Sequence, residues 1–465
     1  MMNENINIEE IENILRSNSV PDDGELDDIL NRALCYENDK AESPCLSMQD
    51  VSKLLNCQNE EQHQRILEAA FKVKKKVFGD RIVLFAPLYI SSYCSNNCLY
   101  CGFRRENKHA KRIKLSTEEA VEQALILEKK GFKRVLLVTG EDPSRTPVSY
   151  INDVVKSIYD NTGIRIIHLN APPMSVNYLR RIRDTGVGVF QSFQETYHPE
   201  TYKIMHPSGI KASYNFRLET MDRALTSGFK DVGIGVLLGL YNYKFEVLAL
   251  MQHSYYLLKK FGTYPHTVSV PRLRPASGAI INDTPHIVSD IEFERIVAVY
   301  RLALPVTGIV ITTRESSSFR DKLLTCGISQ MSAGSKTDPG GYAKDDDNLD
   351  TKQFSIHDKR SLEEILQSIV ESDQIPSFCT TCYRVGRIGS KFKNIAQSGR
   401  IKNFCALNAI LTLKEYLINH NGSDSSDCLE KIIERRIERV EPDKVKEDLI
   451  KKMKALEDGE KDLYY

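Results

Sequence analysis

The sequence Cys94-Ser-Asn-Asn-Cys98-Leu-Tyr-Cys101 places three cysteines at a C-x3-C-x2-C spacing on one short stretch. Iron–sulfur clusters are normally held by four cysteine thiolates, so a triad indicates a [4Fe–4S] cluster with one iron that has no protein ligand. An open iron of this kind can chelate a substrate or cofactor and pass it an electron. Zinc is the alternative, but structural zinc favours four ligands in paired halves, and no second half lies nearby in the sequence. The stretch therefore predicts an open iron–sulfur cluster.

The composition of the chain excludes several classes of function. It has 465 residues, with 63 Lys and Arg against 63 Asp and Glu, so its charge predicts neither a nucleic acid nor an anionic membrane as partner. No apolar run approaches the ~20 residues that a membrane-spanning helix needs. Its 11 cysteines, without an export signal, indicate thiolates used on metals in a reducing, cytoplasmic and anaerobic setting.

A β/α alternation that begins at residue 81 predicts the fold. The predicted strands are short apolar, β-branched runs at 81–91, 134–140, 164–170, 187–195, 231–239, 266–273, 308–314 and 327–333. Amphipathic helical patterns separate them, and one helix is predicted to begin at the capping box Ser116-Thr-Glu-Glu119. Eight strands at this rhythm predict an α/β fold, a complete (β/α)8 TIM barrel.

Three regions are predicted along the chain. Residues 1–75 are charged and mostly helical in pattern, which predicts an N-terminal extension, and residues 76–343 are expected to form the barrel. Residues 344–465 predict a mostly helical C-terminal domain, introduced by the acidic linker Lys344–Asn348.

Polar residues follow the predicted strands at their carboxyl ends, where barrel enzymes place their active sites. They are the cysteine triad, Thr139-Gly-Glu-Asp142, Asn170, Gln194-Glu-Thr-Tyr-His198, Arg272 with Arg274, Arg314-Glu315 and Ser332–Gly341. Polar groups gathered on one rim around a cluster loop predict an active site there.

A second group of cysteines, Cys379, Cys382 and Cys405, follows the barrel in a C-x2-C-x22-C pattern. It indicates either a second open cluster or a structural zinc site completed by a remote ligand, for which Cys428 is conceivable. His266 begins the sixth strand at the opposite, lower rim, where a lone histidine is usually a structural hydrogen-bonding group. If the C-terminal domain docks on this rim, the two sites lie roughly 20 Å or more apart across the barrel.

Together these motifs resemble the aromatic amino acid lyase branch of radical S-adenosylmethionine (SAM) enzymes. The resemblance is carried by the first triad, Gln194–His198, Pro271-Arg-Leu-Arg-Pro275, Thr313-Arg-Glu315 and Ser332–Tyr342, and it spans about residues 45–440. Within that branch, the C-x2-C-x22-C triad and Pro265-His266-Thr267 are similar to the tyrosine lyases that mature FeFe-hydrogenase. The tyrosine lyases of thiamine biosynthesis lack the C-terminal cluster.

The resemblance implies a reaction in two parts. At the first cluster, SAM yields a 5′-deoxyadenosyl radical that takes hydrogen from tyrosine, and the Cα–Cβ bond fragments to p-cresol and dehydroglycine. At the second cluster, dehydroglycine yields carbon monoxide and cyanide on a labile iron, as the precursor of the hydrogenase H-cluster. The implied cofactors are SAM and two [4Fe–4S] clusters, the second with the additional labile iron. The implied partners are tyrosine, free cysteine, an electron donor such as ferredoxin or flavodoxin, and other hydrogenase maturases.

The resemblance also implies roles for single residues. The second triad ligates the second cluster, and His266 ligates its extra iron as a neutral imidazole. The residues expected around SAM are Tyr100 at the adenine, Thr139, Gly140 and Glu141 at the ammonium, Glu195 at the ribose and Arg217 at the carboxylate. Arg314 is expected to grip the tyrosine carboxylate through a bidentate pair, with Arg274 and Arg272 as competing choices.

Two other functions stay open. One is a lyase of the thiamine type, whose C-terminal cysteines are structural. The other, from a different class, is a non-catalytic zinc-binding assembly factor, although such a module has no need for the rim of polar motifs.

Overall fold

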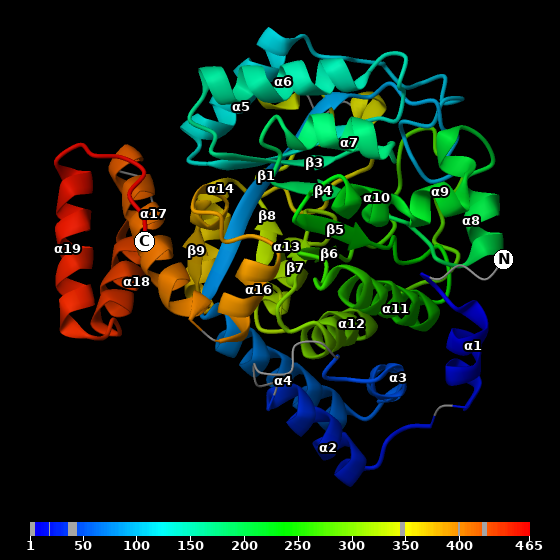
Figure 1. Ribbon diagram of the computed structural model, residues 1–465, viewed down its shortest axis with the longest axis horizontal. Coiled ribbons are helices and arrows are strands. Elements are labelled where there is room, and N and C mark those ends of the chain that lie inside the picture. The colour runs from blue at the N-terminus through cyan, green and yellow to red at the C-terminus, as the bar shows by residue number, and fades with distance from the viewer. Residues whose placement is uncertain (1–4, 18, 36–43, 345–348, 399, 421–425) are drawn as a thin grey trace.

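The structure, a computed structural model, describes residues 5–17, 19–35, 44–344, 349–398, 400–420 and 426–465. At its centre is a parallel barrel (Figure 1). Its strands are β1 (Arg81–Ser91), β2 (Arg134–Thr139), β3 (Ile166–Asn170), β4 (Val189–Gln191), β5 (Asp231–Gly235), β6 (Thr267–Ser269), β7 (Gly308–Ile311) and β8 (Gln330–Ser332). Neighbouring strands pair in order, and β1 pairs with both β2 and β8, which closes the barrel. The predicted (β/α)8 barrel is confirmed.

Helices follow the strands and cover the outside of the barrel. They are α5 (Thr117–Lys129), α6 (Val148–Asn161), α7 (Val176–Arg183), α8 (Pro199–Met205), α9 (Tyr214–Leu218), α10 (Thr220–Thr226), α11 (Tyr243–Phe261), α12 (Asp290–Ala303) and α13 (Ser317–Leu323). Helix α5 begins at the predicted capping box, in which Glu119 N donates to Ser116 Oγ at 3.1 Å. Several strands are shorter than predicted. The run 187–195 is strand only at β4, and beyond its end Glu195 takes a positive φ of 71° and forms an isolated parallel bridge with Val236.

Strand β1 extends beyond its barrel partners at the lower rim. Its first residues, Arg81–Val83, pair in parallel with β9 (Ile375–Ser377). This ninth strand was not predicted, because a run of three residues containing Pro376 gives no strand pattern. It joins the C-terminal region to the barrel through main-chain hydrogen bonds, and it delivers the chain to Cys379 at the amino-terminal ends of the strands.

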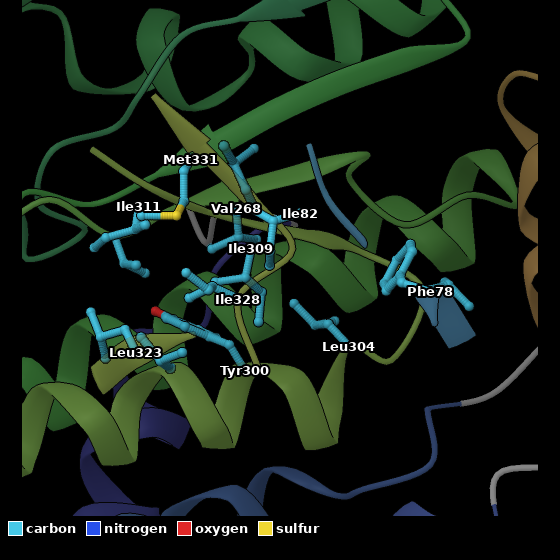
Figure 2. Packing of buried hydrophobic residues seen from close by; sticks show 14 of the residues in the cluster. Phe78, Ile82, Val268, Tyr300, Leu304, Ile309, Ile311, Leu323, Ile328 and Met331 are labelled. Carbon is cyan, nitrogen blue, oxygen red and sulfur yellow. The ribbon is translucent and has the colours of Figure 1, made fainter. Parts of the chain in front are cut away.

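Apolar side chains fill the space between the barrel and its helices. Figure 2 shows Tyr300 and Leu304, from and just after α12, packed with Ile309 and Ile311 of β7 and Met331 of β8. All five are buried, with at most 1% of their surface exposed. This close-packed apolar layer fixes the positions of the strands, and therefore also the positions of the polar residues at the strand ends.

The remaining helices flank the barrel. The N-terminal helices α1 (Ile8–Ser17), α2 (Asp23–Leu34), α3 (Met48–Asn56) and α4 (Glu60–Phe78) lie against α11 and α12 (Figure 1). The C-terminal helices are α14 (Leu362–Glu371), α15 (Thr381–Arg384), α16 (Ser390–Gln397), α17 (Ile401–Asn419), α18 (Ser426–Glu438) and α19 (Asp443–Glu457). The predicted boundary after residue 75 falls within α4, and most of the predicted linker, 345–348, lies outside the described residues. No described helix is long and apolar enough to cross a membrane.

Candidate cofactor sites at the two rims

The first cysteine triad lies on the loop that leaves β1 at the upper rim, which is formed by the carboxyl ends of the strands. Cys94, Cys98 and Cys101 all line one cavity of about 180 Å³. The loop is fixed to the end of β2, because Ser95 N and Oγ both donate to the main-chain oxygen of Glu141, at 2.9 and 2.7 Å. The three thiols therefore converge on one preformed space.

The electrostatics of these thiols fit a bound cluster. Burial, together with the neighbouring Glu141 and Cys101, raises the pKa of Cys94 to about 11. Burial likewise raises the pKa of Cys98, and the other two cysteines add to the shift. The thiols thus oppose one another's ionisation, and bound iron removes that penalty because coordinated thiols are deprotonated. A donor set of three thiols on one loop fits a [4Fe–4S] cluster with an open position.

Charged groups, most of them buried, line the upper cavity beside the triad. Arg217 Nη1 donates to Glu141 Oε1, and Asn96 Nδ2 donates to Glu141 Oε2 at 2.6 Å. Lys211 Nζ donates to Glu195 Oε1 at 2.6 Å. Burial raises the pKa of Glu141, but Arg217 and Lys211 outweigh it, so that the pKa is lowered and the carboxylate is charged. The wall presents both signs of charge to a zwitterionic ligand.

The loop after β4 is held by a buried glutamate on α11. Glu246 accepts hydrogen bonds from Thr196 Oγ1 and, at 2.8 Å, from Tyr197 N. Burial raises the pKa of Glu246 to about 7. These contacts adjoin Glu195, whose left-handed main chain costs free energy that the surroundings must supply. Glu246 therefore helps to aim Glu195 into the cavity.

Three predicted SAM contacts lie on the same wall. Gly140 is packed against the cysteine loop so closely that a Cβ atom would lie 2.2 Å from the main-chain oxygen of Tyr93. Thr139 and Gly140 both line the cavity. Tyr100 lines it too, and its hydroxyl shares a hydrogen bond of 2.8 Å with His206 Nε2. The cysteine loop can pack this closely against the end of β2 only because residue 140 is glycine.

The three candidate arginines for the substrate carboxylate differ in their partners. Arg272 and Arg274 both donate to Glu315 Oε2, Arg274 Nη2 at 2.8 Å, and neither lines the cavity. Arg314 lines the cavity, and its guanidinium lies over the ring of Phe354, 3.4 Å from the centroid. No described carboxylate lies within ion-pair distance of Arg314. The geometry favours Arg314 as the group that can receive a carboxylate.

The second triad lies at the lower rim, in a separate cavity of about 50 Å³. Cys379, Cys382 and Cys405 line it together with His266. Burial lowers the pKa of the nearby Arg81 guanidinium, but the three thiols outweigh it and the pKa is raised. The fold thus brings Cys405 and the segment 379–382 close to His266, which directly precedes β6. Cys428 lies on α18 and is not among the residues that line this cavity.

Both nitrogens of the His266 imidazole face polar groups. Nδ1 lies 3.5 Å from Asp231 Oδ1, and Nε2 shares a hydrogen bond of 2.9 Å with the hydroxyl of Tyr383. Asp231 Oδ1 also accepts from Gly389 N at 3.0 Å, which ties β5 to the C-terminal region. An acidic partner on one ring nitrogen orients the other toward a metal. The donor set of three thiols and an oriented imidazole fits a cluster with a further iron.

Within the described ranges, no group of three or more His, Cys, Asp and Glu side chains is arranged so that it could hold a metal ion. The fit of both triads therefore rests on their donor chemistry and on the shared cavities. Sequence reasoning missed four residues of the two sites, which are Asn96, Lys211, Asp231 and Tyr383. Asp231 could have been found from strand register, because it begins β5 beside the entrance of β6, where His266 lies.

Comparison with known proteins agrees with this geometry. The radical SAM superfamily matches residues 88–252, and the biotin and thiamin synthesis associated domain matches residues 269–374. The 2-iminoacetate synthase of Salmonella typhimurium is 31% identical over 325 residues, which cover 70% of this chain and 84% of that protein. The superfamily implies a [4Fe–4S] cluster and SAM at the upper triad, and the associated domain suggests a second cluster.

Two solved structures extend the similarity to the whole chain. A crystal structure of HydG, a maturase of the [FeFe]-hydrogenase, has a TM-score of 0.94 and 41% identity, and covers 100% of both chains. The X-ray structure of the FeFe-hydrogenase maturase HydG from Carboxydothermus hydrogenoformans has a TM-score of 0.83 and 35% identity, and covers 97% of both chains. The chain belongs to the radical SAM superfamily and, within it, to the HydG family of maturases.

Proposed function

We propose that this chain is a tyrosine lyase that makes an iron carbonyl–cyanide precursor of the FeFe-hydrogenase H-cluster. The upper site cleaves the Cα–Cβ bond of tyrosine to p-cresol and dehydroglycine. The lower site converts dehydroglycine to carbon monoxide, hydrogen cyanide and water, a set of products that accounts for all of its atoms. The single observation that carries the proposal is the pair of thiol triads in separate cavities at the two rims of one barrel.

The upper site has the groups that this reaction needs. When bound, the cluster and SAM supply an electron and a 5′-deoxyadenosyl radical. Glu141 is charged and faces the cavity, which suits the SAM ammonium, and Arg217 suits its carboxylate. Glu195, with Lys211 beside it, suits the ribose hydroxyls. Apolar walls and burial exclude water from a radical that would react with it.

Arg314 is proposed to hold the tyrosine carboxylate. Its guanidinium is a planar fork that can donate two parallel hydrogen bonds to a carboxylate, a geometry that lysine cannot reproduce. The stacking on Phe354 fixes the plane of that fork. Arg272 and Arg274 lie outside the cavity, and their hydrogen bonds to Glu315 hold in place the residue that follows Arg314.

At the lower site, Cys379, Cys382 and Cys405 are proposed to hold the second cluster, and His266 to hold the labile iron, with free cysteine completing its shell. Asp231 faces Nδ1 and would orient the ring so that Nε2 is the atom offered to the iron. A route between the sites is supported by Gln330 of β8, whose side chain lines both cavities. Dehydroglycine would therefore pass through the barrel instead of through bulk water.

The similarity to a 2-iminoacetate synthase favours one alternative, a lyase that releases dehydroglycine for thiamine synthesis. An anaerobic assay of the iron-reconstituted chain with SAM, dithionite and tyrosine separates the two. The proposal expects p-cresol together with carbon monoxide trapped by haemoglobin. Formation of p-cresol without carbon monoxide, from protein with both clusters filled, would assign the thiamine type. Protein that carries zinc and cleaves no SAM would be an assembly factor.

A further inference from the structure

The segment that follows the upper triad is strongly basic. Residues 104–114 read RRENKHAKRIK, with six Lys and Arg and a single Glu, whereas Lys and Arg equal Asp and Glu over the whole chain. This charge is not needed to bind SAM or tyrosine, because none of the residues 104–114 lines the upper cavity. Its position next to the cluster loop calls for another explanation.

The segment is fixed in place by hydrogen bonds, most of them to the main chain around it. Arg112 donates from Nη1 to the main-chain oxygens of Ser92 and Phe103, both at 2.8 Å, and from Nη2 to Arg104 O at 2.6 Å. Lys111 N donates to Asp350 O at 3.0 Å. The exposed side chains of this segment are therefore displayed from a rigid main chain, which preserves their arrangement for a partner.

An open groove runs beside this segment over the cluster loop. It is lined by Tyr93, Arg112, Ile113, Lys114, Ser144 and Arg145. The guanidinium of Arg145 lies 4.5 Å from the ring centroid of Tyr93, and Tyr93 directly precedes Cys94. On the other side of the loop, Phe103 N donates to Cys101 Sγ at 3.4 Å. The groove thus begins one residue before Cys94, and the basic segment begins three residues after Cys101.

Several of these cations have no acidic partner. Within the described residues, Lys108, Lys111, Lys114 and Arg145 form no ion pair with a carboxylate, and all four are exposed. The one acidic residue of the segment, Glu106, pairs with Arg104 and Arg105. Unpaired like charges repel one another, so an acidic surface would bind here with electrostatic steering. Figure 1 shows the β1–α5 loops at the end of the barrel away from the red C-terminal helices.

We propose that Arg105, Lys108, Lys111, Lys114 and Arg145 form the docking surface for an acidic, low-potential ferredoxin. This inference rests on the proposed function, whose first step needs one electron at the upper cluster. The electron balance is simple: the reduced ferredoxin loses one electron and the upper cluster gains it, with no bond made. The groove beside this surface is lined by Tyr93, the residue before the first thiol of the upper triad.

The test compares two triple variants. One carries Lys108→Glu, Lys111→Glu and Lys114→Glu, and the matched control carries Lys444→Glu, Lys451→Glu and Lys454→Glu, which are exposed on α19. An acidic two-cluster ferredoxin is the probe, and its Kd and the rate of cluster reduction, followed by electron paramagnetic resonance, are measured at low and high salt. At low salt we expect the first variant to bind ferredoxin about tenfold or more weakly and to be reduced about tenfold or more slowly than wild type. Both differences from wild type should shrink at high salt, because salt screens the charges.

A small reductant separates this inference from the proposed function. With photoreduced deazaflavin, which needs no docking surface, the first variant should form p-cresol at the wild-type rate. Failure of wild-type protein to form p-cresol with deazaflavin would count against the proposed function and not against the docking surface. Wild-type rates with ferredoxin in the first variant, or an equal loss in the control, would overturn the docking surface. If wild type bound a single-stranded RNA probe, and the first variant lost that binding while its reduction by ferredoxin was unchanged, the surface would belong to nucleic acid and the docking surface would be overturned as well.

Discussion

The upper and lower cavities use the same kind of ligand set in different surroundings. Each contains three cysteines, but the upper cavity has a volume of about 180 Å³ against about 50 Å³ below. The upper wall carries paired carboxylates and cations, which suit zwitterions such as SAM and tyrosine. The lower wall carries an imidazole, a phenol and two guanidiniums, those of Arg81 and Arg134, which suit a small fragment and a metal. Cavity size and wall chemistry, and not the cysteine motif, distinguish the two sites.

The largest expected effect comes from removing the upper triad. Cys98→Ala should abolish both p-cresol and carbon monoxide, because the lower site receives its substrate from the upper one. Iron content should fall by about four atoms per chain. The matched control is Cys326→Ala, which removes a buried thiol that lines neither cavity and should keep both products. Carbon monoxide from Cys98→Ala with tyrosine would contradict the coupling of the two sites.

Removing the imidazole should affect the lower site alone. His266→Ala should keep p-cresol and lose the iron-bound carbonyl–cyanide species, which infrared spectroscopy detects, together with about one iron per chain. Tyr383→Phe is the comparison, since it removes the hydroxyl that bonds Nε2 and keeps the imidazole itself. A normal yield of the iron-bound species from His266→Ala would show that the imidazole is not a ligand.

The arginine assignment predicts a smaller effect, confined to the upper site. Arg314→Lys keeps the charge and loses the bidentate geometry, so kcat/KM for tyrosine should fall about 10- to 100-fold. SAM cleavage in the absence of tyrosine should change little. Arg274→Lys, whose partner is Glu315, should leave KM for tyrosine near the wild-type value. The reverse pattern in the two variants would make Arg274 the substrate clamp.

The smallest effect concerns the support of the upper wall. Burial raises the pKa of Glu246 to about 7, above its ordinary value, so the folded chain binds a proton more tightly than the unfolded chain. Its stabilising contribution should be complete at low pH and disappear as pH rises from about 4.5 to about 7. Glu246→Gln should remove this slope, which amounts to about 3 kcal/mol in the free energy of unfolding.

Urea unfolding of Glu246→Gln and wild type at pH 5 and pH 8 measures this difference. Glu200→Gln, at an exposed position on α8, is the control and should leave the pH dependence as it is in wild type. An identical slope in wild type and Glu246→Gln would mean that Glu246 titrates as an exposed carboxyl does.

The barrel and the upper triad could be predicted because their signals are local. Apolar runs at regular spacing mark the strands, and three cysteines within eight positions mark the cluster loop. Strand β9 could not be predicted, since its three residues gain their conformation from pairing with Arg81–Val83. Lys211 lies in a short 3-10 turn with no motif, and only folding brings it to Glu195.

The lower site could be predicted only in part. The C-x2-C-x22-C spacing marks its cysteines, but neither the spacing nor the periodicity links them to His266. That link depends on which rim the C-terminal region docks on, and the docking is made by β9 and by contacts such as Gly389 N to Asp231. Long-range pairing of this kind leaves little trace in local sequence patterns.

The most direct test of two separate sites is one anaerobic measurement on Cys379→Ala beside wild type. With SAM, dithionite and tyrosine, p-cresol and carbon monoxide are quantified from the same sample, along with iron. The two-site account predicts p-cresol at the wild-type yield, no carbon monoxide, and the loss of about one cluster's iron. Carbon monoxide at the wild-type yield, or loss of p-cresol together with carbon monoxide, would contradict it.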